Sequence, residues 1–213
     1  MWPIILIIIS VSAPGLAALS FLYPRFISGL RAFSLVYGIG SAVITFELLL
    51  YFVIARQAFS PWLLWFFGAQ TLIALLVFVL RFPWKNQLTI DVAKVKPLSW
   101  LLGCLIAALL FLSLIQALGK PPVAFDSIAF WATRAEILLA DGAVNFDRSS
   151  PDYLASYNHP NYPWHVSLLE YWFRLLGASG GVVNLLAWFY FMSLTLFIID
   201  FSIKYLGQVK GLL

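Results

Sequence analysis

Charged side chains are scarce in this chain of 213 residues: they make up 10% of the sequence, whereas a soluble domain carries about 25%. Hydrophobic residues make up 62% of the chain, and the mean hydropathy is +0.94. A soluble protein cannot hide so much apolar surface from water. The composition therefore excludes an ordinary soluble domain and indicates a protein that crosses a membrane several times.

Cysteine and histidine are also rare, with one and two residues respectively. The single Cys104 excludes an internal disulfide and lies in an apolar run without metal-binding neighbours, so we expect a small buried hydrophobic residue. His159 and His165 are separated by two prolines, a spacing that matches no common zinc site. We therefore predict no metal site from these residues and no cofactor, and whether the protein depends on a metal stays open.

Apolar runs long enough to cross a bilayer core of about 30 Å recur along the sequence. We predict spans at residues 4–23, 32–55, 61–80, 98–118 and 181–205. The shorter run at residues 164–176 has two interpretations: it crosses as a tilted short helix, or it re-enters the membrane and turns at the glycine-rich residues 177–181. The predicted fold is all-α, a polytopic transmembrane helical bundle of five or six spans in one domain, residues 1–213.

The net charge of +4 is placed between the apolar runs, so we interpret it as a topology signal and not as a nucleic-acid surface. Lysine and arginine gather after the first and third runs, which places those connections in the cytoplasm. The long loop at residues 119–163 holds five of the nine acidic residues and is predicted to lie outside. The N-terminus is then outside too, in a multi-pass protein of the cytoplasmic membrane. Lys204 and Lys210 end inside if residues 164–176 re-enter, and outside if they cross.

The first half of the external loop reads "FDSIAFWATRAEILLADG", residues 125–142. Its apolar residues recur at helical spacing, and Gly142 is a natural stop. We predict a helix that lies on the outer membrane surface, with Ser127, Arg134 and Asp141 on its water-facing side. Asp126, at the start of this helix, is either an N-cap or a carboxylate that accepts a proton from an incoming hydroxyl.

The second half ends in "YNHPNYPWH", residues 157–165, in which two prolines stiffen the backbone. This segment either is a rigid approach to the next helix or uses His159 and Tyr162 to hold an anionic headgroup such as a lipid phosphate.

Ionised side chains inside apolar runs are costly and often functional. Glu47 lies deep in the second run and suggests an internal hydrogen bond, although the sequence names no partner. Glu170 and Arg174 are four residues apart, which predicts a helical ion pair. Arg174, close to a turn, is alternatively a contact for a lipid phosphate.

These loop residues resemble a known family, the membrane glycosyltransferases of the GT-C fold, and among them the bacterial enzymes akin to protein mannosyltransferases. In that family an Asp follows the exit of a span, then a helix with a Trp, then a His-Pro-x-Tyr-Pro string that opens the next helix. The resemblance covers about residues 125–177, a quarter of the chain.

The resemblance implies a sugar donor carried on a polyprenyl phosphate, an acceptor hydroxyl outside the cytoplasmic membrane, and Asp126 as the general base. It places Trp131, Arg134, His159 and Tyr162 around the donor. Two departures stand out. The family has ten or more spans, so this chain is expected to be the N-terminal part of such an enzyme or a short relative that needs a second membrane subunit. "FD" also replaces the commoner "WD" or "DE", so a metal-assisted reaction is not expected.

Other classes of function compete with this hypothesis. A non-catalytic membrane protein, either an accessory subunit or a carrier of lipids or solutes, agrees with the small number of spans. A transporter is less favoured because only one segment is interrupted by glycines. A hydrolase is less favoured still, because no nucleophile motif is present.

Overall fold

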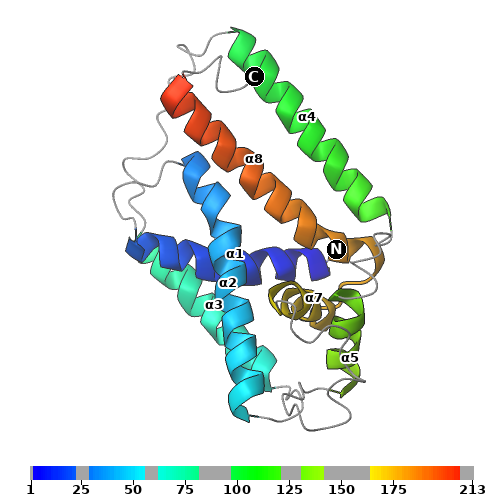
Figure 1. Ribbon diagram of the computed structural model, residues 1–213. Coiled ribbons are helices and arrows are strands. Elements are labelled where there is room, and N and C mark those ends of the chain that lie inside the picture. The colour runs from blue at the N-terminus through cyan, green and yellow to red at the C-terminus, as the bar shows by residue number, and fades with distance from the viewer. Residues whose placement is uncertain are drawn as a thin grey trace.

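The computed structural model describes residues 2–22, 29–55, 62–81, 97–120, 131–141 and 164–206, and every element in these ranges is a helix (Figure 1). Five helices are long and apolar enough to cross a membrane. They are α1 (Trp2–Leu22), α2 (Gly29–Ala55), α3 (Trp62–Arg81), α4 (Pro97–Gly119) and α8 (Leu185–Leu206), which continues from the 3₁₀ helix η4 (Gly180–Asn184). The predicted all-α polytopic bundle is confirmed, and the ends of these helices lie within four residues of the predicted ones.

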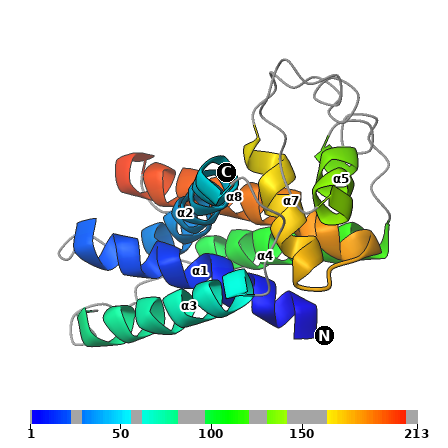
Figure 2. The same ribbon diagram turned by 90° about the horizontal axis from the view of Figure 1, so that it is seen from below.

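Two short helices, α5 (Thr133–Asp141) and α7 (His165–Leu175), lie side by side in both views (Figures 1 and 2). At 1.5 Å per residue, their 9 and 11 residues span only about 14 and 17 Å, less than a bilayer core. α5 ends directly before Gly142, as predicted. α7 is buried on all sides over residues 167–173. It is therefore a helix of the protein core and not a peripheral one.

α1 and α2 cross at two glycines that let their backbones touch. A Cβ atom built on Gly15 would lie 2.0 Å from the Val36 carbonyl oxygen, and one on Gly40 would lie 1.8 Å from the Val11 carbonyl oxygen. Small residues allow such close approaches between helices in membranes, where lipid does not drive helices together. α3 packs on α1, and α8 packs on α2, so this crossing is the centre of the bundle.

The chain reverses direction sharply after α7. Gly177 and Gly180 have φ angles of +89° and +51°, which only glycine adopts easily. η4 then packs against the end of α4, where the Asn184 side chain donates hydrogen bonds to the carbonyl oxygens of Ala117 (3.0 Å) and Lys120 (2.7 Å). The turn thus brings the start of α8 to the end of α4.

This placement bears on the two interpretations of residues 164–176. Because α8 begins where α4 ends, α8 runs back along α4. The end of α8 thus returns to the side on which α4 begins, as the re-entrant alternative expects, and the choice between the two interpretations stays a prediction. The N-terminus, α5, α7 and the end of α4 lie on the same side of the molecule, at the right of Figures 1 and 2. The side chains of Lys204 and Lys210 lie outside the described residues.

The predicted burial of Cys104 is wrong. Cys104 is exposed on α4, not buried. The apolar run around it correctly predicted a membrane span, but α4 contacts mainly η4 and α8, so most of its surface faces outward from the bundle. In a membrane such a surface contacts lipid or another helix, and an apolar sequence does not distinguish a lipid-facing side from a buried one.

Candidate functional site

The residues predicted to form the site divide into two groups. Asp126, His159 and Tyr162 lie outside the described residues, as does Ser127. The structure describes Trp131 at the start of the α5 segment, Arg134 on α5 and Arg174 on α7. Trp131 is half-buried and forms a π-helical turn with the next residue. The three described residues belong to the α5 segment, which lies within the loop at residues 119–163, and to α7, which follows this loop.

Arg134 is fully buried, so its predicted place on the water-facing side of the helix is wrong. Its guanidinium carbon lies 5.1 Å from the ring centroid of Trp164, a cation–π distance. The physical reason is helical periodicity: Arg134 is four residues before Leu138, so both share the face that packs on α7. Ala135 and Leu138, two of the apolar residues whose helical spacing predicted this helix, are buried.

Arg174 joins α5 to α7 through two carboxylates. Its Nη2 and Nε atoms donate to Glu170 Oε1 at 2.8 and 3.1 Å, and its Nη1 atom lies 3.2 Å from Glu136 Oε1. The predicted helical pair of Glu170 and Arg174 is confirmed. Glu136 on α5 is an additional partner, so a phosphate that approached Arg174 would compete with this exposed carboxylate.

Burial raises the pKa of Glu170, and the hydrogen bond and charge of Arg174 oppose that rise. A buried carboxylate is costly unless it is paired and hydrogen-bonded, and Arg174 supplies both interactions. The ion pair therefore stabilises the ionised form of Glu170 while holding α7 against α5.

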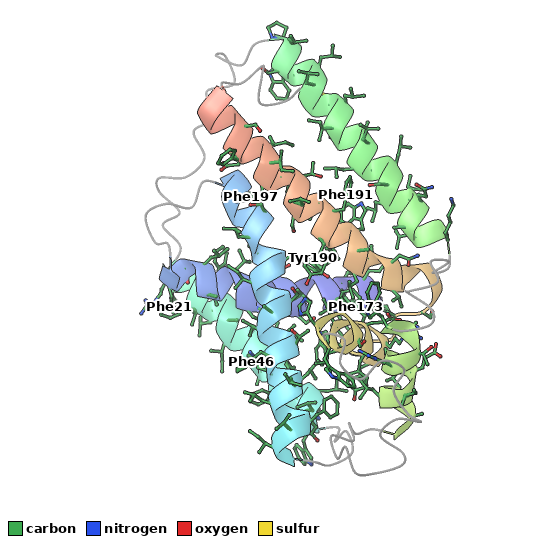
Figure 3. All side chains as sticks on the ribbon, in the orientation of Figure 1. Phe21, Phe46, Phe173, Tyr190, Phe191 and Phe197 are labelled. Carbon is green, nitrogen blue, oxygen red and sulfur yellow. The ribbon has the colours of Figure 1, made fainter. Side chains whose placement is uncertain are left out.

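A second polar cluster lies where α2, α7 and α8 meet. Thr45 Oγ1 is 2.8 Å from His165 Nδ1, His165 Nε2 is hydrogen-bonded to the Tyr190 hydroxyl, and Ser41 Oγ is 2.8 Å from the same hydroxyl. Figure 3 labels Tyr190 where α8 passes α2. We call Ser41, Thr45, His165 and Tyr190 the His165 network.

The two hydroxyl groups of α2 in the His165 network also donate to backbone carbonyl oxygens about one turn earlier. Thr45 Oγ1 donates to the Ser41 carbonyl oxygen at 2.9 Å, and Ser41 Oγ donates to the Gly38 carbonyl oxygen at 3.0 Å. His165 joins α2 to α8, because one ring nitrogen contacts the Thr45 hydroxyl and the other contacts the Tyr190 hydroxyl. Burial lowers the pKa of His165 from 6.5, which favours the neutral imidazole.

This network was not predicted from the sequence. His165 was considered only as a zinc ligand, yet both of its ring nitrogens contact hydroxyl groups. A usable signal was present, because Ser41 and Thr45 are two hydroxyl residues four positions apart in an apolar span, on one helix face. Among the described residues, no three His, Cys, Asp or Glu side chains are grouped to hold a metal ion.

Replacing His165 with phenylalanine is expected to destabilise the protein by about 2 kcal/mol near pH 8, since Thr45 and Tyr190 each lose a buried partner. Because the folded-state pKa of His165 is lowered, its contribution is present above pH 6.5 and is lost as the pH falls through the folded-state value. The difference in stability between this variant and the wild type should therefore become smaller toward pH 5. Thermal unfolding in detergent at pH 8 and at pH 5 measures this difference.

Tyr190→Phe is the matched control for this measurement. It removes one hydroxyl and keeps the titrating imidazole, so we expect a loss of about 1 kcal/mol and the pH dependence of the wild type. A stability difference between His165→Phe and the wild type that does not change with pH would show that the fold does not favour the neutral imidazole.

Glu47, predicted to make an internal hydrogen bond, has a partner on the neighbouring helix. Its Oε1 atom accepts from Gln70 Nε2 of α3 at 2.5 Å. The remaining oxygen of each side chain, Glu47 Oε2 and Gln70 Oε1, is buried without a hydrogen-bond partner in the described residues. α2 and α3 thus share one polar contact, in which one oxygen of each side chain has no hydrogen-bond partner among the described residues.

No protein-family model, no curated protein sequence and no solved structure matches this chain. The evidence on its function comes from its own residues: the helices α5 and α7, the ion pair that joins them, and the His165 network. Five apolar helices of membrane-spanning length make the chain a multi-pass membrane protein.

Proposed function

We propose that the chain is a membrane glycosyltransferase, or the N-terminal part of one, that moves a sugar from a polyprenyl-phosphate carrier to an acceptor hydroxyl. The reaction takes place at the outer face of the cytoplasmic membrane. The observation that carries the proposal is the resemblance of residues 125–177 to the first external loop of the GT-C enzymes. The N-terminus and the loop at residues 119–163 lie outside in this proposal.

The packing of α5 against α7 supports the proposal. Asp126 precedes Trp131 by five positions, and Tyr162 precedes Trp164 by two. A chain extends by at most about 3.5 Å per residue, so both residues are tethered closely to these two tryptophans. Arg134 of α5 lies over the Trp164 ring. The helix inside the loop and the helix that follows the loop thus form one packed scaffold, as a site assembled from the two halves of the loop requires.

In the proposed reaction Asp126 accepts the proton of the acceptor hydroxyl. The hydroxyl oxygen forms a bond to the anomeric carbon of the sugar while the bond from that carbon to the phosphate oxygen breaks. The polyprenyl phosphate leaves with the bonding electrons. Trp131, Arg134, His159, Tyr162 and Arg174 are the proposed donor contacts, and cations or N–H donors near the phosphate would stabilise its developing charge. The proposed chemistry uses no metal ion.

Asp126→Asn is expected to lower sugar transfer at least a hundredfold while the protein still inserts and folds, because the amide keeps the side-chain shape but cannot accept the proton. Transfer of a radiolabelled sugar from a polyprenyl phosphate, measured in membranes that contain the full native protein, gives the rate. Asp147→Asn is the matched control, since it changes an acid of the same loop outside the resembling strings. Normal transfer by Asp126→Asn would reject Asp126 as the base.

A second candidate is a non-catalytic membrane protein, either an accessory subunit or a carrier of lipids or solutes. The observation that favours it is the outward-facing surface of α4, which in the described residues packs mainly on η4 and α8. Another membrane subunit, or further spans of a longer chain, would cover this surface. Stoichiometric co-purification with a second membrane protein, together with no transfer by this chain alone, would favour this candidate.

A further inference from the structure

α5 packs on the other described helices mainly through a single neighbour, α7. Figures 1 and 2 show it at the edge of the bundle, beside α7. Ala135 and Leu138 of α5 are fully buried, but Glu136 and Leu139, the residues that follow them, are exposed. In α7, by contrast, every residue from 167 to 173 is buried, and this helix also packs on α2 and η4. α7 is thus part of the core, whereas α5 is docked on it.

The ion pairs between α5 and α7 can separate without leaving a buried charge unpaired. Arg174 of α7 contacts two carboxylates: the buried Glu170 on its own helix and the exposed Glu136 on α5. If α5 moves away, Glu136 enters water, while Glu170 keeps both of its hydrogen bonds from Arg174. An ion pair with an exposed partner contributes little to stability, because water solvates the separated groups well. The polar part of this joint therefore opposes separation only weakly.

The remaining contacts of the joint come from a narrow strip of α5. The Arg134 guanidinium lies 5.1 Å from the centroid of the Trp164 ring, and Ala135 and Leu138 supply the buried apolar surface. Within the described part of α5, Leu138 is the one large apolar side chain that is fully buried. A helix of nine residues is not stable by itself in water. The backbone hydrogen bonds of α5 therefore depend on this docking.

We propose that α5 is a lid that docks on α7 and leaves it as one unit, while α7 stays in the bundle. Opening uncovers the side of α7 that runs from Trp164 to Arg174, and it frees the Nη1 atom of Arg174. Local openings that cost less than global unfolding are typical of such elements. The proposal does not depend on the glycosyltransferase function, so it can hold or fail whether or not the protein transfers sugar.

The test is hydrogen–deuterium exchange of the full native protein in lipid nanodiscs, read by mass spectrometry with fragmentation that resolves single amides. We expect the hydrogen-bonded amides of α5 to exchange together, and about a hundredfold or more faster than those of residues 167–173. Equal protection of the two helices would reject the lid, because they would then open only together. Exchange that becomes slower step by step from one end of α5 inward would also reject it, since that is fraying.

Two neighbouring leucines of α5 provide a matched pair of variants. Leu138→Ala removes the large buried side chain, so we expect exchange of α5 to become about thirtyfold faster or more, with α7 unchanged. Leu139→Ala makes the same change at an exposed position and should alter exchange less than about twofold. Glu136→Gln, which removes only the exposed ion pair, should accelerate α5 by up to about fivefold.

The response of α7 to Leu138→Ala decides between a lid and a rigid pair of helices. Acceleration of α5 and α7 by the same factor, or no acceleration of α5, would reject the proposal. If Leu138→Ala does not fold, the comparison of α5 with α7 in the wild-type protein still decides.

Discussion

Replacing Gly40 with alanine is expected to destabilise the bundle by about 3 kcal/mol or more, at the upper end of the cost of overpacking. The new Cβ atom would lie 1.8 Å from the Val11 carbonyl oxygen and 2.9 Å from its carbon, both backbone atoms that no side-chain rotation can move. α1 and α2 must then separate. Because α3 packs on α1 and α8 packs on α2, the loss extends to the whole bundle. A fall in the thermal unfolding midpoint in detergent measures it.

Gly38→Ala is a matched control on the same helix. A Cβ atom on Gly38 meets nothing within 4 Å, so only helix propensity changes, in favour of alanine by about 1 kcal/mol. We expect this variant to be as stable as the wild type or slightly more stable. Gly15→Ala faces the Val36 carbonyl oxygen at 2.0 Å and should behave like Gly40→Ala. Equal midpoints for Gly38→Ala and Gly40→Ala would contradict the close crossing of α1 and α2.

Replacing Arg174 with methionine is expected to cost about 3 kcal/mol near neutral pH, because Glu170 is then left buried without its cation. Burial already raises the pKa of Glu170, and the variant removes the interaction that opposes this rise. A raised folded-state pKa means that the protonated carboxyl is favoured in the fold. Stability is therefore retained at low pH and is lost as the pH rises through the folded-state pKa. The penalty of Arg174→Met should grow from pH 4.5 to pH 8.

Two further variants separate the buried charge from general damage to α7. The double variant Glu170→Gln with Arg174→Met replaces the stranded carboxyl with a neutral amide, so it should recover much of the stability at pH 8. Glu136→Gln removes the exposed partner of Arg174 and should cost less than about 1 kcal/mol. Unfolding midpoints at both pH values test all three. A penalty for Arg174→Met that does not change with pH would mean that the unpaired Glu170 charge is not its cause.

Local patterns were predicted well. The spans follow from the length of the apolar runs, because a helix must cover about 30 Å of hydrocarbon with its own backbone hydrogen bonds satisfied. The pair of Glu170 and Arg174 follows from their spacing on one helix. The end of α5 follows from Gly142. Each of these depends on residues that are close in sequence, where helix geometry alone fixes the relation.

Contacts between distant segments were not predictable in the same way. Arg134 was predicted to face water, because α5 was expected to lie on the membrane surface with no partner on that face. In the structure α7 packs against α5, and Arg134 is buried. The partner of Glu47 was not predicted, because Gln70 is 23 residues away on another helix. The contact of His165 with Thr45, 120 residues apart, was not predicted either.

The sequence by itself determined that this is an all-α membrane protein, roughly where its five long helices lie, and that its polar chemistry gathers in and beside one long loop. These properties depend on how much apolar surface each segment carries and on helical spacing. Only the tertiary structure decided that α7 turns back to bring α8 beside the end of α4, that Arg174 joins α5 to α7, and that Glu47 accepts a hydrogen bond from Gln70 on the neighbouring helix. A one-dimensional pattern shows that a helix face must be covered, but which helix covers it depends on close backbone contacts such as that between Gly15 and Gly40.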